Sequence, residues 1–262
     1  MVKIVTLENG LWALAVLLMA GLFALLLYRT NHRVYPYLSG YVLIALLQSP
    51  LLFTTYRVWG FDSRTASNIA WGIQGLVITA RALAVAEICR RVLAKYRGIW
   101  ALAWRMLLAI AGLVLVYAWA VSRLNWPQAI LNADRGLELA IAVAIVILFL
   151  FVKYYEIIVE PTVLYLSIGL FLFSCFSVLN NTILENWLHS YATLWNLLGT
   201  LAFIASLLLW IWAVREEQPE TPLEPKLIPQ GAYHALVPEI NYRLKALNEQ
   251  LSQFWRVEAN RS

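Results

Sequence analysis

The chain has few charged residues, and this scarcity excludes a compact water-soluble domain. Asp, Glu, Lys and Arg make up 13% of its 262 residues, whereas apolar residues make up 61%. Soluble globular domains carry about 25% charged and about 45–50% apolar residues. Because an apolar excess this large cannot be buried in one aqueous core, we expect most of the chain to lie in a lipid bilayer.

Cysteine and histidine are also scarce, which removes several kinds of site. Cys89 and Cys175 lie in apolar runs without a CxxC motif, so we expect neither a disulfide framework nor a metal site. The three histidines lie outside the apolar runs or at their edges, where no pair can hold a haem between helices. The sequence also lacks an HExxH motif, a glycine-rich phosphate loop and a lysine in its last apolar run. We therefore expect no cofactor, no retinal pigment and no enzyme activity.

What the chain does contain is seven apolar runs, each long enough to cross a bilayer as a helix. Short polar connections separate them, so consecutive helices should be antiparallel neighbours. The pattern predicts an all-α integral membrane protein, a seven-transmembrane-helix bundle. The predicted spans run approximately over Gly10–Tyr28, Pro36–Tyr56, Ile69–Arg90, Trp100–Ser122, Ala129–Val152, Pro161–Ile183 and Tyr191–Val214.

Lysine and arginine in alternate connections predict the orientation. Eight lie on one side and four on the other, and the richer side is expected in the cytoplasm. The N-terminus is then outside and the C-terminus cytoplasmic, in a bacterial inner membrane. Aromatic residues at the span ends suit the headgroup layer, and we expect no nucleic-acid partner. The eight are Arg29, Arg33, Arg90, Arg91, Lys95, Arg97, Lys153 and Arg215; the four are Lys3, Arg57, Arg64 and Arg123.

The composition divides the chain into three segments. Residues 1–214 form the predicted bundle, 215–237 a linker rich in proline and glutamate, and 238–262 a cytoplasmic amphipathic tail helix. The tail either lies on the membrane or the bundle, or residues 238–257 contact a cytoplasmic partner or a second copy. Its apolar seam is Ile240, Leu244, Leu247, Leu251 and Phe254.

Arg81 is the most informative polar residue, because it lies near the middle of the third span. A charge there costs about 2.5–3.5 kcal/mol, so it should face protein or water and have a partner. Glu138 in the fifth span lies at a compatible depth and is the predicted partner. The resulting network either binds a small ligand or ion, or only holds helices together. Its other predicted members are Gln48, Gln74, Asp134, Asn180 and Asn196.

Glu87 lies six residues nearer the cytoplasmic end than Arg81. The two side chains point about 120° apart on a helix, so they should not pair directly. Two arrangements remain open for Glu87. It forms a local ion pair with Arg90 and Arg91, or it forms a cytoplasmic latch to another helix that involves Lys153.

Three functions are compatible with these features. The first is a sensory or receptor-type bundle that binds a small ligand near Arg81 and signals to a cytoplasmic partner through the basic loop and the tail. The second is a non-catalytic subunit or assembly factor of a membrane protein complex. The third is a small-solute or proton-linked transporter that uses Glu138 and Glu87, although the sequence shows no internal repeat of the kind common in transporters.

Overall fold

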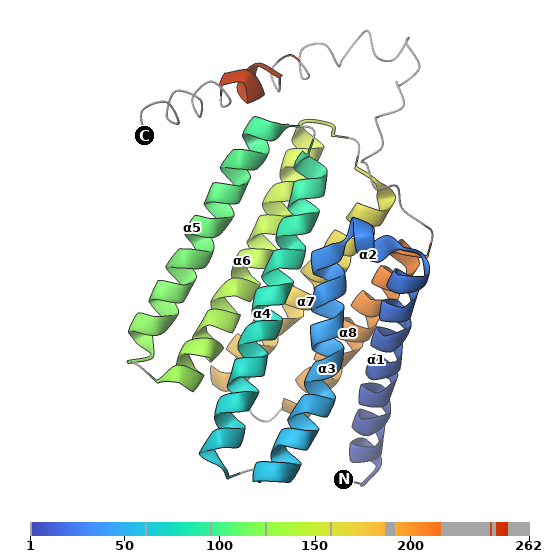
Figure 1. Ribbon diagram of the computed structural model, residues 1–262, viewed down its shortest axis with the longest axis vertical. Coiled ribbons are helices and arrows are strands. Elements are labelled where there is room, and N and C mark those ends of the chain that lie inside the picture. Colours follow the sequence, from blue (N-terminus) through green and yellow to red (C-terminus); the bar gives the residue numbers. More distant parts are fainter. Residues whose placement is uncertain are drawn as a thin grey trace.

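The computed structural model describes residues 2–60, 62–94, 96–123, 125–157, 159–186, 192–215, 242 and 245–250, with the backbone alone at 2–9, 97, 180–186 and 192–194. Within these ranges every regular element is a helix (Figure 1). Seven helices are long and apolar enough to cross a membrane, which confirms the predicted all-helical membrane bundle. Apart from Arg215, the predicted linker lies outside the described residues, and so does most of the predicted tail helix.

Seven long helices and one short one follow each other over residues 2–215 of the described chain, and residues 245–250 of the tail are helical as well. Four begin earlier than the apolar runs predicted, at Val2, Arg64, Arg97 and Trp126, because helical hydrogen bonding continues past the ends of the apolar stretch. The short helix was not predicted. The bounds are α1 Val2–Tyr28, α2 Asn31–Val34, α3 Pro36–Trp59, α4 Arg64–Leu93, α5 Arg97–Val121, α6 Trp126–Tyr154, α7 Pro161–Asn186 and α8 Ala192–Ala213.

The bundle has two ends that differ in charge. We call one the basic end: α1, α4, α6 and α8 end there, and α3, α5 and α7 begin there, at the top of Figure 1. The opposite end contains the connections α3–α4, α5–α6 and α7–α8. The basic end contains Arg29, Arg33, Arg90, Arg91, Arg97, Lys153 and Arg215. Which end faces the cytoplasm remains a prediction.

Helix α4 is central and α5 is peripheral. Consecutive helices pack as antiparallel pairs, α3 with α4, α5 with α6 and α7 with α8, and α1 closes the bundle against α8 and α3. Helix α4 also contacts α5, α6 and α7. The inward face of α4 is therefore surrounded by protein, and Arg81 is buried on this face, which is the environment that it requires.

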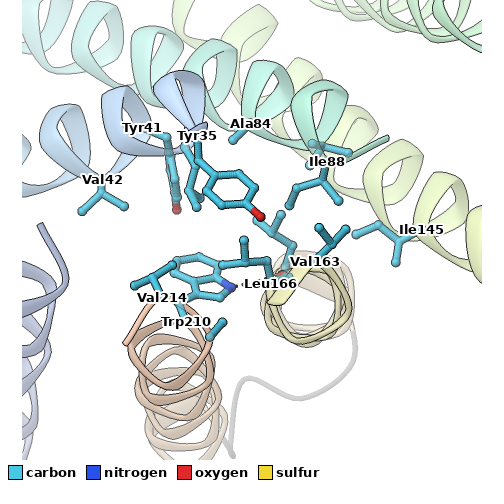
Figure 2. Packing of buried hydrophobic residues seen from close by; sticks show 14 of the residues in the cluster. Tyr35, Tyr41, Val42, Ala84, Ile88, Ile145, Val163, Leu166, Trp210 and Val214 are labelled. Carbon is cyan, nitrogen blue, oxygen red and sulfur yellow. Dashed lines mark hydrogen bonds between the residues drawn. The ribbon is translucent and has the colours of Figure 1, made fainter. Parts of the chain in front are cut away.

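The tightest helix contact joins α7 and α8 in the basic half of the bundle. The indole of Trp210 is buried, and its Nε1 donates a hydrogen bond to the carbonyl oxygen of Leu166 at 3.2 Å. A Cβ atom at Gly169 would overlap this indole, so the close approach requires glycine. Figure 2 shows Trp210 beside Leu166 and facing Tyr41, whose ring stands edge-on to it with the centroids 6.2 Å apart.

Candidate ligand-binding site

Arg81 of α4 forms an ion pair with Glu138 of α6, the partner predicted from depth. Both side chains are buried, with 7% and 1% of their surface exposed. The guanidinium also lies 4.6 Å from the ring centroid of Phe173 and 5.6 Å from that of Tyr41. A cation over aromatic faces is attracted to them, more strongly where water is absent. Arg81 is thus held by side chains of α3, α6 and α7, and the pair carries no net charge.

A second set of polar contacts joins α3, α4 and α6. The Nε2 of Gln48 donates to Oε1 of Gln74 at 3.0 Å, and Nε2 of Gln74 donates to Oδ2 of Asp134 at 3.5 Å. Asp134 lies one helical turn before Glu138 on α6, so both carboxylates face α4. The structure therefore brings five of the seven predicted network residues together.

The two predicted asparagines fall in different places. Asn196 is exposed on α8, and its carbonyl oxygen accepts a hydrogen bond from the Thr200 hydroxyl at 2.8 Å. Asn180 belongs to α7, but its side chain lies outside the described part of the chain. Asn196 and Arg81 line the same cavity, but no hydrogen bond among the described residues joins them.

That cavity measures about 460 Å³ and lies between α1, α3, α4, α7 and α8. Ligand pockets usually measure about 300–1,000 Å³ and combine apolar walls with a few polar groups. Arg81 forms part of its wall, and Glu138 lies behind Arg81, outside the lining. The aromatic lining is Trp12, Tyr41, Phe173 and Phe203, and the polar lining besides Arg81 is Gln48, Ser49, Asn196 and Thr200.

The electrostatics of the cavity follow from the ion pair. Glu138 neutralises Arg81 from behind, so an occupant of the cavity meets a balanced charge and several hydrogen-bonding groups. Four aromatic side chains supply the rest of the contact surface. The arrangement suits a small uncharged molecule with an aromatic or otherwise flat part. Among the described residues, no group of three or more His, Cys, Asp or Glu side chains could hold a metal ion.

Glu87 latches α4 to α3, by a contact that the sequence did not predict. Its Oε1 accepts the backbone N–H of Tyr37 at 3.2 Å, and its Oε2 accepts that of Leu38 at 2.9 Å. These N–H groups belong to the first turn of α3, where the helix provides no acceptor and its dipole favours a negative charge. Glu87 is therefore an N-terminal cap for a neighbouring helix.

The other predicted latch residues take different roles. The charges of Arg91 and Arg90 both act on Glu87, and the guanidinium of Arg91 also lies 4.7 Å from the ring centroid of Tyr35. Lys153 is exposed at the end of α6, and no ion pair joins it to Glu87 in the part of the chain that the structure describes. The latch thus reaches α3, and among the described residues no hydrogen bond or ion pair links Lys153 to it.

The basic end contains a second buried connection. Asn31 of α2 is fully buried, and its Nδ2 donates a hydrogen bond to the carbonyl oxygen of Val214 at 3.0 Å. Tyr35, which follows α2, is fully buried as well, and burial raises the pKa of its hydroxyl and keeps it neutral. The sequence interpretation missed both residues. The polar segment between the first two apolar runs, which contains Asn31, is a signal that could have drawn attention to them.

The described part of the tail contacts the start of α5. Oδ1 of Asn248 accepts the backbone N–H of Gly98 at 2.7 Å, which caps the first turn of α5. Leu247, a member of the predicted seam, is exposed. The other four seam residues lie outside the described residues: Ile240, Leu244, Leu251 and Phe254.

No protein family, curated protein or solved structure matches this chain at a significant level. A function must therefore be argued from the geometry and chemistry of the site itself. Two features are available for that argument. One is the cavity beside Arg81, and the other is helix α8, which lines this cavity and ends at the basic end.

Proposed function

We propose that the chain is a seven-helix membrane receptor that binds a small uncharged ligand in the cavity beside Arg81. The observation that carries this proposal is the cavity itself, in which a neutralised arginine, four aromatic rings and several hydrogen-bonding groups converge. A buried arginine used only to hold helices together needs no open space beside it, whereas a binding site does.

A path for the signal is available along α8. Asn196, Thr200 and Phe203 line the cavity, and α8 ends next to Val214, which is bonded to Asn31. The chain then continues into the predicted linker and tail. A ligand that shifts α8 would therefore act directly on the basic end, where the tail caps α5. We place this end in the cytoplasm of a bacterial cell, on the distribution of lysine and arginine, and a cytoplasmic protein partner there would receive the signal.

One observation favours the alternative function, that of a non-catalytic subunit or assembly factor. It is the chain of side-chain hydrogen bonds from Gln48 through Gln74 to Asp134. Its side chains bond to one another across three helices, which is what helix-stabilising polar residues do in membranes. In a non-catalytic subunit or assembly factor these bonds would only hold the bundle together. Such a chain would purify with a stoichiometric companion and would bind no small molecule.

Thermal unfolding of the purified full-length chain in detergent tests the receptor proposal. We expect a library of small uncharged aromatic compounds to contain molecules that raise the Tm. A ligand at 100 times its Kd stabilises the folded state by about 2.7 kcal/mol. Each genuine ligand should lose much of this effect in Asn196→Ala and in Thr200→Val, because both residues line the cavity.

A matched control comes from α4. The Thr79 hydroxyl donates to the Gly75 carbonyl oxygen at 2.8 Å, the same local bond that Thr200 makes, but Thr79 lies outside the cavity lining. Thr79→Val should therefore leave every ligand effect intact. The proposal fails if no compound raises the Tm, or if the hits stabilise Thr200→Val as strongly as Thr79→Val.

A further inference from the structure

A second cavity lies at the basic end, between the start of α3, the end of α4 and the start of α5. It measures about 480 Å³, and it shares no lining residue with the cavity beside Arg81. Helix α4 contacts both α3 and α5, so it forms the floor of a cleft with α3 and α5 as walls. The side chains that matter for its chemistry are Tyr37, Leu83, Ala86, Arg90, Trp100 and Trp104.

Two charged residues, Glu87 and Arg90, line this cleft, and the cation is Arg90. Its side chain is exposed, and no hydrogen bond or ion pair within the described residues engages its guanidinium. Glu87 also lines the cleft, but both of its carboxylate oxygens accept N–H groups at the start of α3. The Arg90 donors are therefore available to an anion, and a guanidinium can bind a phosphate through two parallel hydrogen bonds.

The apolar part of the cleft extends away from Arg90 into the membrane. Leu83 lines it and lies seven residues before Arg90 on α4, which corresponds to about 10 Å along the helix axis. The rings of Trp100 and Trp104 stand together on the α5 wall, with their centroids 5.8 Å apart. Tryptophan favours the boundary between headgroups and acyl chains, so the cleft spans this boundary.

We propose that this cleft binds an anionic glycerophospholipid. The phosphate lies on Arg90 at the level of the headgroups, and an acyl chain extends past Trp104 toward Leu83 and Ala86. The cleft supplies a positive group at its polar end and about 10 Å of largely apolar wall below it, from Arg90 to Leu83, which matches the headgroup and the first part of an acyl chain. This site is independent of the ligand cavity, so it stands or falls separately from the receptor proposal.

Native mass spectrometry of the full-length chain, released from detergent micelles, tests this site. The micelles are doped with equal amounts of phosphatidylglycerol and phosphatidylcholine. We expect the wild type to retain phosphatidylglycerol in preference. Removing one arginine near an anionic headgroup weakens binding about fivefold, so Arg90→Gln should lose most of the preference. Arg90→Lys should keep it, and Trp104→Ala should weaken retention of both lipids.

The matched control is Arg29→Gln. Arg29 is exposed at the same end of the bundle, where its guanidinium lies 5.5 Å from the ring centroid of Tyr28, but it lies outside the cleft. This variant should retain phosphatidylglycerol as the wild type does. Equal retention of the two lipids by the wild type would overturn the site, and so would an equal loss in Arg29→Gln and Arg90→Gln. Displacement of the lipid by glycerol 3-phosphate would show a site for a soluble anion instead.

Discussion

Glu138→Ala is expected to destabilise the protein by about 3–5 kcal/mol, because it leaves Arg81 buried and charged without its partner. Only 7% of the Arg81 side chain is exposed, and Phe173, Tyr41 and Glu138 lie around its guanidinium, so most of its charge stays inside the protein when the carboxylate is lost. The free energy of unfolding, measured by titration of the folded chain in mild detergent with sodium dodecyl sulfate, should fall by this amount. Glu156→Ala, at an exposed site beyond α6, should leave it unchanged.

The paired variant Arg81→Met/Glu138→Leu separates lost charge compensation from lost packing. Because it removes both charges and keeps apolar volume, it should be more stable than Glu138→Ala and close to the wild type. The two positions are then coupled, and the effects of the single substitutions do not add. Two results would show that the ion pair does not hold α4 against α6. One is a paired variant that is as unstable as Glu138→Ala, and the other is an unchanged free energy of unfolding in Glu138→Ala.

Glu87→Ala is the substitution with the second largest expected effect, about 2–4 kcal/mol of lost stability, since a hydrogen bond to a charged group contributes about 1.5–3 kcal/mol. It deprives two N–H groups in the first turn of α3 of their acceptors. No side chain beside them takes over, because Tyr35 at the N-cap position of α3 makes no side-chain hydrogen bond to the helix. The same detergent titration measures the change.

Glu87→Gln distinguishes capping from simple loss of a charge. The amide oxygen can still accept one of the two N–H groups, so this variant should lose less stability than Glu87→Ala. If capping is the role of Glu87, the order of stability is wild type, then Glu87→Gln, then Glu87→Ala. Equal stability of all three proteins would mean that the start of α3 does not depend on Glu87.

The spans were predictable because each one is a single run of consecutive apolar residues. Each run of about 20 apolar residues must form a helix, since no other open structure satisfies its backbone in hydrocarbon. The helix ends were less predictable, because α4 extends back to Arg64 through polar residues that lipid does not constrain. Helix α2 escaped prediction because four residues are too few to show a period.

The ion pair was predictable because depth along two helices limits the choice of partner. A mid-span arginine needs a carboxylate, and Glu138 lies at a compatible depth. The capping contact of Glu87 was not predicted, because it joins a side chain on α4 to backbone groups of α3. The cavity has no signal in the sequence either: Phe173 and Phe203 line it, yet apolar positions that face lipid look the same.

Arg105 escaped the sequence interpretation although it is a charged residue within a span. It is exposed on α5, seven residues after Gly98 and about 10 Å from the basic end along the helix. An arginine at this depth can extend its side chain to the headgroups while its stem stays in lipid. Its position nearer the basic end agrees with the distribution of positive charge in the connections.

The central claim, a chain that crosses the membrane seven times with its basic end in the cytoplasm, is tested most directly by labelling single cysteines with a membrane-impermeant maleimide. The background carries Cys89→Ala and Cys175→Ala, and the reporters are Asp62→Cys between α3 and α4 and Glu156→Cys after α6, both at exposed positions. In intact spheroplasts Asp62→Cys should react at once, and Glu156→Cys only after the membrane is permeabilised. Reaction of both reporters in sealed cells, or of Glu156→Cys alone, would contradict this topology.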